Sequence, residues 1–344
     1  MTPPPQPDVT VDVLADYLAA EISGFGTLQD IKKFSSGQSN PTFQLTASSG
    51  RYVLRCQPTG ALLKSAHQVD REFRVMKALS STDVPVPQML HLAKEEGPLG
   101  RDFYVMGFLE GRILWDPALP EMSNTERGAI YDQMSTVLAA MHGVDLEATG
   151  LADYGAPGNY YERQFSRWSK QYRASEIDPV PEMDALIDWI GSRVPPDDGL
   201  ISLVHGDWRI DNLMFHPTEP RIIGVLDWEI STLGHPVADL AYQCMQWQLP
   251  NSGTMRGLGG VDRSAIGLPS DEEYVAAYCR RRGWDGIDNW PFYLAFSFFR
   301  LIAILQGVVR RAHDGNASNP EKAKMMAAAI PLLAGLATKI TKGH

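Results

Sequence analysis

The sequence has few cysteines, and their placement limits what they can do. Cys56, Cys244 and Cys279 are the only three in 344 residues, and no C-x-x-C pair occurs. A disulfide framework needs an even, closely spaced set, and a structural zinc site needs paired ligands. Neither is expected here, and we predict a reduced, cytoplasmic setting.

An excess of positive charge is also missing. Lys and Arg number 31 against 41 Asp and Glu, which gives a formal net charge of −10. Nonspecific binding to nucleic acid depends on a basic surface, so nucleic acid is not an expected partner. No internal repeat is present, and the start, MTPPPQPDVT, lacks the basic and apolar segments of a signal peptide. We expect a flexible tail there and no export by that route.

An uninterrupted hydrophobic run long enough for a membrane span is absent as well. Residues 290–309 are strongly apolar, but Arg300 lies in the middle with Gln306 nearby, and Pro291 suits a first helical turn. We predict a buried C-terminal helix and no membrane partner.

The most informative segment is residues 203–242. Asp207 and Asn212 are five residues apart, and Asp227 follows twenty residues after Asp207. Protein kinases share this spacing, in which one Asp accepts the proton of the attacking hydroxyl and the Asn and the later Asp hold magnesium. Carboxylate and amide oxygens are suitable Mg²⁺ ligands. We therefore predict Asp207 as the base and Asn212 and Asp227 as the metal ligands.

The residues around this pattern predict a rigid support. Residues 201–204, 213–215 and 222–226 are short apolar runs typical of strands, with the turn sequence HPTEP between the last two. We expect His205 to brace the loop backbone. The alternative is that the segment is an ordinary turn with buried contacts.

The first hundred residues predict a small sheet-rich lobe. Residues 31–34, 42–46 and 51–56 have strand patterns, and residues 9–22 and 68–79 have helical spacing. The polar loop SSGQSNP after the first strand could cover nucleotide phosphates through Gly37, Ser39 and Asn40. The alternative is an ordinary hairpin.

Two further features of this lobe suggest nucleotide binding. Arg55 ends a strand and Glu72 lies in the following helix, where kinases place a cation and its carboxylate partner. The usual cation is Lys, but Arg keeps the charge and adds a planar fork; a surface ion pair is the alternative. After the strand at 103–108, backbone groups near Met106, Phe108 and Leu109 could bind adenine.

The remainder of the chain is predicted to be helical apart from the catalytic hairpin. The predicted helices are residues 127–142, 160–174, 183–190, 271–282 and 291–312. We therefore predict a nucleotide-binding lobe over residues 1–108 and a catalytic and acceptor-binding lobe over residues 109–344.

Several motifs together resemble the aminoglycoside phosphotransferase family of kinase-like enzymes. They are SGQSN, VLR, REF, MGFLEG, HGDWR with Asn212, and DWE. The segments RQFSRWSKQY and STLGHPVADLAY resemble in particular the kinase-like part of acyl-CoA dehydrogenase family members ten and eleven; a dehydrogenase part is absent from this sequence.

The resemblance implies a fold class and an activity. The fold would be α+β, a bilobal protein-kinase-like fold with a small antiparallel β N-lobe and a larger α-helical C-lobe. The activity would be transfer of phosphate from ATP or GTP, with Mg²⁺, to a small-molecule hydroxyl. Gly206 replaces the Arg that would pair with a phosphorylated activation loop, so we predict no such switch.

The acceptor is less defined by the sequence. Arg163, Arg167 and Lys170 recur on one face of a predicted helix and would suit an anionic acceptor such as a hydroxy acid or a hydroxyacyl-CoA. A solvated helix face is the alternative.

Arg209 could offset charge on the transferred phosphate, or stiffen the loop through a salt bridge. An aminoglycoside kinase and a catalytically impaired nucleotide-binding regulator stay open, and nothing indicates an oligomeric state.

Overall fold

The computed structural model describes residues 8–34, 40–59, 67–156, 158–253, 255–315 and 320–343. The predicted phosphate contacts Gly37 and Ser39 lie outside the described residues. The chain divides into two compact units. Unit 1 comprises Met1–Ile113, Glu147–Leu151 and Asp211–Ile230, and unit 2 comprises the rest. We predicted a boundary after residue 108, with the catalytic hairpin in the second lobe; in the structure most of that hairpin groups with unit 1.

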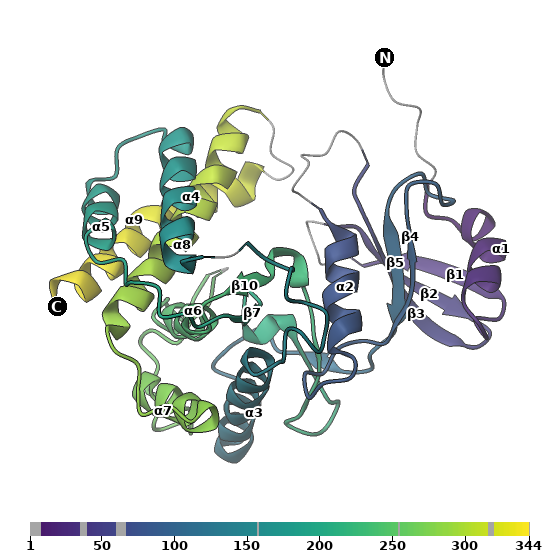
Figure 1. Cartoon of the computed structure of the whole chain (residues 1–344), viewed down its shortest axis with the longest axis horizontal. Coiled ribbons are helices and arrows are strands. Elements are labelled where there is room, and N and C mark those ends of the chain that lie inside the picture. Colours follow the sequence, from purple (N-terminus) through teal and green to yellow (C-terminus); the bar gives the residue numbers. More distant parts are fainter. Residues whose placement is uncertain are drawn as a thin grey trace. The chain divides into compact units, whose positions relative to one another are not determined.

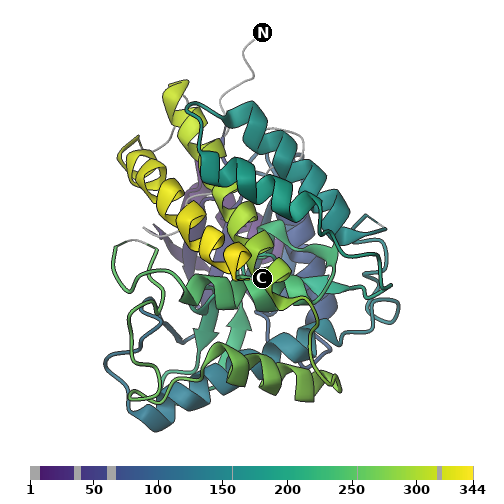
Figure 2. The same cartoon turned by 90° about the vertical axis from the view of Figure 1, so that its left-hand side faces the viewer.

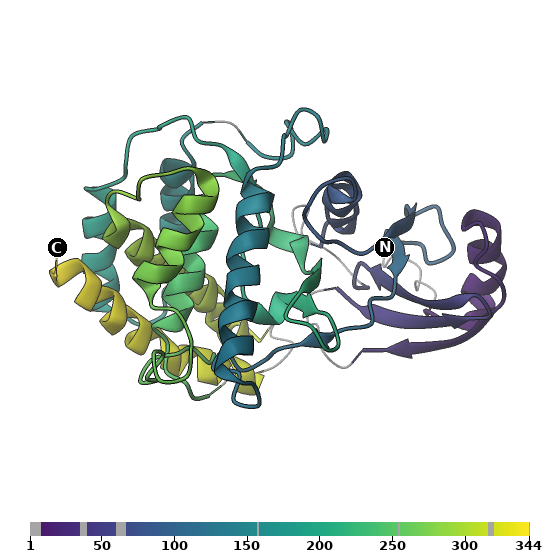
Figure 3. The ribbon, with the colours of Figure 1, turned by 90° about the horizontal axis from the view of Figure 1, so that it is seen from below.

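Unit 1 is built on a five-stranded antiparallel sheet in the order β1-β2-β3-β5-β4 (Figures 1 and 3). Four of the five strands were predicted, within a few residues, by their apolar patterns. β4 was missed because it is a short segment, MLHLA, without clear alternation. The strands are β1 (Leu28–Lys33), β2 (Thr42–Ala47), β3 (Gly50–Cys56), β4 (Met89–Ala93) and β5 (Phe103–Gly107).

Two helices cover the two faces of this sheet. Leu14 and Leu18 of α1 (Val11–Glu21) pack in one buried cluster with Leu54 and Phe103. Successive residues of a strand point to opposite faces of the sheet. Arg55 follows Leu54, and Tyr104 follows Phe103, so both point to the face away from α1. That second face meets α2 (Val69–Leu79), which contacts β4 and β5. The predicted cation of β3 is thereby placed against the predicted helix.

A second, three-stranded sheet holds the hairpin of residues 213–225, which the sequence predicts to be catalytic, within unit 1. Its order is β6-β8-β9, from β6 (Arg112–Ile113), β8 (Leu213–Phe215) and β9 (Ile222–Val225). Short 3₁₀ helices precede and follow the hairpin at Ile210–Asn212 and Trp228–Ile230. Arg112 donates from Nε to the His216 carbonyl at 3.1 Å, so the strand after the predicted hinge is tied to the hairpin.

The close approach of Gly111 to β8 yields a test of this tie. A Cβ at Gly111 would overlap the Phe215 carbonyl oxygen and lie 2.6 Å from Met214 Cγ. We expect Gly111→Ala to lower the free energy of unfolding by about 1–3 kcal/mol, because overpacking forces the backbone to shift. Urea denaturation measures the effect. Gly286→Ala, where a Cβ meets nothing within 4 Å, is the control; equal effects of the two changes would contradict this packing.

Unit 2 is mainly helical (Figure 2). The helix α8 lies at its centre and contacts α4, α5, α6 and α9, while α7 packs along α3. A two-stranded antiparallel sheet of β7 (Ser202–Val204) and β10 (Thr232–Gly234) completes the unit. The helices are α3 (Asn124–His142), α4 (Tyr160–Ser175), α5 (Pro181–Gly191), α6 (Val237–Trp247), α7 (Asp271–Arg282), α8 (Trp290–His313) and α9 (Pro320–Lys342).

Helix α8 is the apolar segment that the sequence predicted to be buried. Of the two described helices that are long and apolar enough to cross a membrane, α8 has 78% of its apolar stretch buried inside the protein, as a core helix does. The other, α9, is 28% buried and follows α8, so α8 is not the C-terminal helix. All three cysteines are free and buried.

Candidate active site

Arg55 joins two carboxylates in unit 1. Its Nε lies 3.0 Å from Glu72 Oε2, and its Nη2 donates to Asp227 Oδ1 at 2.9 Å. Glu229 Oε2 is 3.6 Å from the same Nη2. The structure thus brings together the predicted cation, its predicted helix partner and the predicted metal ligand. A surface ion pair, the alternative interpretation, does not describe it, because Glu72 is 1% exposed.

Glu72 is held by three side chains. Asn40 Nδ2 donates to Oε1 at 2.9 Å, and the Tyr104 hydroxyl donates to Oε2 at 3.1 Å, beside Arg55. Burial raises the pKa of Glu72 to about 7, although Arg55 acts in the opposite direction. Asn40 was predicted to contact phosphate; in the structure its amide bonds Glu72 and its carbonyl faces His67 Nδ1 at 2.9 Å. Asn40 therefore positions the carboxylate.

Asp227 occupies a constrained backbone position. Its φ is +64°, which non-glycine residues rarely adopt. The next residue, Trp228, is buried and donates from its indole Nε1 to the Val225 carbonyl at 2.9 Å. This hydrogen bond fixes the backbone on both sides of Asp227. Trp228 stands where the D-F-G motif of protein kinases has Phe, and only its indole N–H can make this bond.

Asn212 and Asp227 lie at the same end of the hairpin. Leu226 N donates to the Asn212 backbone carbonyl at 2.9 Å, and Leu213 pairs with Val225. An amide oxygen and a carboxylate are the hard oxygen donors that Mg²⁺ accepts, with nucleotide oxygens and water completing its shell. Among the described residues no group of three or more His, Cys, Asp or Glu could hold a metal. The roles of Asn212 and Asp227 as Mg²⁺ ligands stay predictions.

In unit 2, the loop that carries Asp207 is fastened by Asp239 of α6. The backbone N–H groups of His205 and Gly206 donate to the two Asp239 oxygens at 2.7 and 2.8 Å. Gly206 has a φ of +86°, which only glycine adopts at no steric cost. The position that carries Arg in protein kinases thus has a backbone requirement of its own; the lack of a phosphorylation switch stays a prediction.

Two histidines complete this support. His142 of α3 contacts Asp239 Oδ2 through Nε2 at 3.3 Å and the Tyr278 hydroxyl through Nδ1 at 2.7 Å. His205 is buried, and its Nδ1 accepts from the Asp207 backbone N–H at 3.2 Å. His205 therefore braces the loop, as expected from the sequence. Burial acts to raise the pKa of Asp239. The hydrogen bonds from His142 and the backbone amides outweigh it and leave the pKa below the usual range.

The burial of His142 predicts a pH dependence of stability. Burial lowers the pKa of His142 below its usual 6.5. Just below pH 6.5 the unfolded chain therefore binds a proton at this residue, whereas the folded chain keeps it neutral. Stability should therefore fall as pH drops below 6.5. In His142→Asn that slope should flatten by up to about 1.4 kcal/mol per pH unit. Denaturation curves from pH 7 to 5 measure it, with the exposed His313→Asn as control; an unchanged slope in His142→Asn would refute the assignment.

Asp207 also has a side-chain neighbour on α6. The Tyr242 hydroxyl is hydrogen-bonded to Asp207. Burial first, and then the Asp207 carboxylate, raise the pKa of Tyr242, whereas the nearby Arg209 and Arg300 act to lower it. The predicted base therefore faces a neutral hydroxyl, and Arg209 lies in the same part of unit 2.

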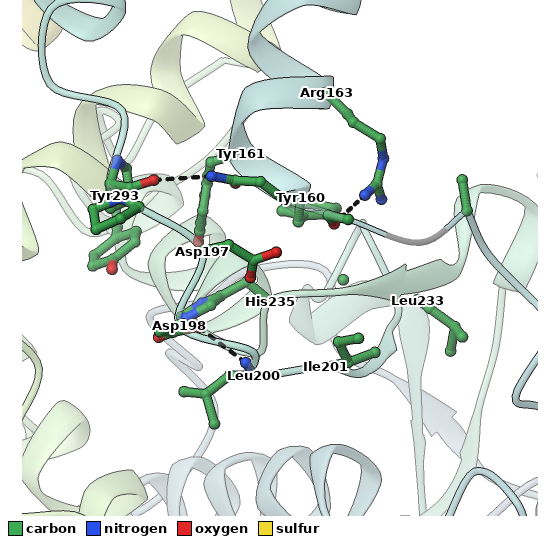
Figure 4. A pocket seen from close by; sticks show the side chains of 16 residues that line it. Tyr160, Tyr161, Arg163, Asp197, Asp198, Leu200, Ile201, Leu233, His235 and Tyr293 are labelled. Atoms are coloured by element: carbon green, nitrogen blue, oxygen red, sulfur yellow. Dashed lines mark hydrogen bonds and ion pairs between the residues drawn. The ribbon is translucent and has the colours of Figure 1, made fainter.

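The three cations predicted for the acceptor lie on the one continuous helix α4, in different surroundings. Arg163 lines a small cavity of about 40 Å³ in unit 2 and donates to the Gly158 carbonyl (Figure 4). Arg167 is exposed and lies over the Trp168 ring at 5.0 Å. Lys170 is exposed and does not line this cavity. In the same cavity His235 Nε2 lies 3.1 Å from Asp198 Oδ2.

The predicted adenine contacts lie where the sequence expected a strand and a hinge. Met106 is in β5, paired with Val53 of β3. Phe108 N donates to the Arg51 carbonyl at 3.3 Å, and the Arg51 guanidinium lies 4.3 Å from the Phe108 ring. Leu109 packs over Gly224 of the hairpin. Adenine binding by these residues stays a prediction.

The comparison with known proteins assigns the family. The model of the phosphotransferase enzyme family matches residues 30–296. The chain belongs to this family. Acyl-CoA dehydrogenase family member 10 of Mus musculus is 46% identical over 310 residues, which cover 90% of this chain and 29% of that protein. This confirms both resemblances predicted from the motifs.

Solved structures of the phosphotransferase enzyme family confirm the fold. A Ralstonia eutropha JMP134 protein that bears the provisional name aminoglycoside phosphotransferase is 46% identical, with a TM-score of 0.88 over 97% of this chain and 98% of that one. Spectinomycin phosphotransferase, solved with ADP and spectinomycin, has a TM-score of 0.66 at 12% identity, covering 97% and 99%. The predicted α+β kinase-like fold and phosphotransferase activity are confirmed.

The chain spans less than half the length of the curated relatives it matches. It covers 29% of the mouse protein and 41% of acyl-CoA dehydrogenase family member 11 of Rattus norvegicus. The activities of those whole proteins therefore do not transfer to this chain.

Sequence reasoning missed several residues that this phosphotransferase uses to support its site. Asp239 lies within the motif STLGHPVADLAY, to which no role was assigned, although a carboxylate in the otherwise apolar run VADLAY indicates a buried anchor. His142, Tyr104 and His67 left no comparable signal, because each meets its partner only through the fold.

Proposed function

We propose that this chain transfers the terminal phosphate of ATP or GTP to a hydroxyl group of a small molecule. Asp207 would serve as the base, with Asn212 and Asp227 as the residues that hold Mg²⁺. The observation that carries the proposal is Arg55, which joins Glu72 to Asp227 within unit 1. In kinases this pairing of a cation with the helix carboxylate, beside the metal-binding Asp, positions the phosphates.

The chemistry assigned to the residues balances in atoms and charge. The acceptor oxygen forms a bond to the terminal phosphorus, the bond from that phosphorus to the bridging oxygen breaks, and the hydroxyl proton goes to Asp207. Mg²⁺, when bound, supplies charge neutralisation at the phosphates. Asp239 keeps the Asp207 loop in place through the two amides, and Arg55 grips phosphate with the edge of its guanidinium. Arg209 would offset charge on the transferred group.

A nucleotide donor is supported by the relatives. The spectinomycin phosphotransferase of similar fold was solved with ADP. In this chain β5 and the hinge from Met106 to Leu109 offer backbone groups for a purine base. ATP and GTP share the phosphate chain that Arg55 would bind, so both are proposed.

The acceptor we propose is a hydroxy acid or a hydroxyacyl-CoA. Arg163 at the cavity, which Asp197 and Asp198 also line, and Arg167 on Trp168 are the cations that would suit an anion better than a polycationic aminoglycoside. The relatives named as acyl-CoA dehydrogenases support an acyl substrate. The provisional name of the Ralstonia protein is the observation that favours the aminoglycoside alternative.

The test is a transfer assay with labelled ATP and GTP over a panel of hydroxy acids, their CoA esters, aminoglycosides and neutral alcohols. We expect magnesium-dependent label transfer to at least one hydroxy acid or CoA ester. Transfer to aminoglycosides alone would replace the proposed acceptor. Nucleotide binding without transfer to any member would favour the regulatory alternative.

A further inference from the structure

Arg300 is a buried cation with an unusual environment. It lies in the middle of α8 and is 7% exposed. Among the described residues its buried Nε has no hydrogen-bond partner. An unpaired buried charge is unfavourable. Such a group is expected where a ligand supplies the missing partner.

Two aromatic rings hold the guanidinium in place. Its Cζ lies 5.9 Å from the Trp168 ring of α4 and 5.6 Å from the Tyr242 ring of α6. Aromatic faces attract a cation but accept none of its in-plane hydrogen bonds. The N–H donors along the edge of the guanidinium thus keep their capacity for an oxygen ligand.

The position of Tyr242 connects Arg300 to the predicted base. The Tyr242 hydroxyl is hydrogen-bonded to Asp207, and the ring of the same residue faces Arg300. One aromatic side chain therefore separates the Asp207 carboxylate from the guanidinium. A small acceptor whose hydroxyl meets Asp207 would present groups a few bonds away to Arg300.

We propose that Arg300 is the specificity residue for the acceptor and binds the carboxyl end of a hydroxy acid, as a free carboxylate or as an acyl thioester carbonyl. This rests on the proposed function and narrows its acceptor. A guanidinium fork matches two carboxylate oxygens and can also donate to one carbonyl oxygen. An aminoglycoside would bring a second cation to this position and is disfavoured.

The test uses a matched pair of acceptors. 3-Hydroxybutyrate and 1,3-butanediol present the same hydroxyl and differ in the carboxylate, and 3-hydroxybutyryl-CoA supplies the thioester. The intact protein should phosphorylate the acid or the thioester with a kcat/KM at least about 100-fold above that of the diol. Whichever of 3-hydroxybutyrate and 3-hydroxybutyryl-CoA has the higher kcat/KM shows whether Arg300 binds a free carboxylate or a thioester carbonyl. Equal use of the diol, or preference for kanamycin, would overturn the inference and leave the kinase proposal standing.

Variants at Arg300 separate binding from a structural role. Arg300→Met should raise KM for the acid or thioester about 100-fold, while kcat/KM for the diol and KM for ATP stay within about twofold. The control is Arg311→Met, an exposed arginine on the same helix. An equal loss on acid and diol would overturn the inference, because it would mean that Arg300 acts on folding or on Asp207.

A second variant covers the case in which Arg300→Met does not fold. Arg300→Lys keeps the charge and loses the fork, so its KM for the acid should rise about 10-fold without a change for the diol. Calorimetric binding of 3-hydroxybutyrate to Asp207→Asn adds a readout that needs no transfer. Binding that weakens about 10-fold in Asp207→Asn/Arg300→Lys supports the site even if the proposed transfer fails, and binding that is unchanged overturns it.

Discussion

Replacing Asp207 by Asn is expected to lower kcat for phosphate transfer by about 10²–10⁴-fold, the range of a general base. Asn has nearly the same shape, and the backbone N–H of residue 207 can still donate to His205 Nδ1. What is lost is the ability to take the proton of the hydroxyl. The KM for the nucleotide should change little, because the predicted phosphate contacts lie elsewhere in the sequence. Steady-state kinetics with the best acceptor of the panel measures both constants.

The control for Asp207→Asn is the same change at an exposed position of unit 2, Asp285→Asn, which should retain full kcat. Thermal melts of both variants check that the fold is intact. If Asp207→Asn transferred phosphate at the rate of the intact protein, Asp207 would not be the base. If neither the intact protein nor the variant transferred phosphate, the nucleotide-binding regulator would be the better description.

The second large effect is expected at Asp239. It is fully buried, and its carboxylate accepts from His205 N and Gly206 N and contacts His142 Nε2. Asp239→Ala leaves two amides and an imidazole buried without an acceptor, so we expect a loss of about 3–5 kcal/mol of unfolding free energy. The loop that carries Asp207 also loses its fastening, so kcat should fall even in protein that remains folded.

Asp239→Asn distinguishes charge from shape. Its amide oxygen can serve one backbone N–H, but its NH₂ group faces the other, so we expect an intermediate loss of stability and of kcat. Asp285→Ala is the matched surface control and should stay within about 0.5 kcal/mol of the intact protein. Urea denaturation followed by kinetics in the absence of urea separates the two effects. A stable Asp239→Ala protein with normal kcat would contradict the fastening role.

The sequence spacing identified candidate catalytic residues, but it did not identify the residues that hold them in place. Asp207, Asn212 and Asp227 were found because kinase chemistry fixes their separation in the sequence. Asp239 lies 32 residues after Asp207, on a helix buried on all sides, and no periodic pattern pointed to the loop it holds. Asn40 was chosen because it follows a polar turn, but only the packing of α2 shows that its amide bonds Glu72. Contacts between distant segments depend on the fold and leave little local signal.

The helices also differ in how clearly the sequence predicts them. The capping box of Ser270 with Glu273 and the glycine at position 283 give α7 clear ends, and the predicted bounds match. In α9, Pro331 and Gly335 lie within the helix and obscured it, since both residues disfavour a helix interior. The helix α6 was missed because nearly all of its residues are buried, so it lacks the polar face that reveals an amphipathic helix.

The Trp228 anchor has a consequence for how such an enzyme would respond in time. Protein kinases rest in inactive forms by swinging out the D-F-G segment, whereas here the indole hydrogen bond to Val225 and the ion pair from Arg55 restrain Asp227 from both sides. These two contacts oppose a swing of Asp227 out of the site. We therefore expect turnover to follow the supply of acceptor and nucleotide.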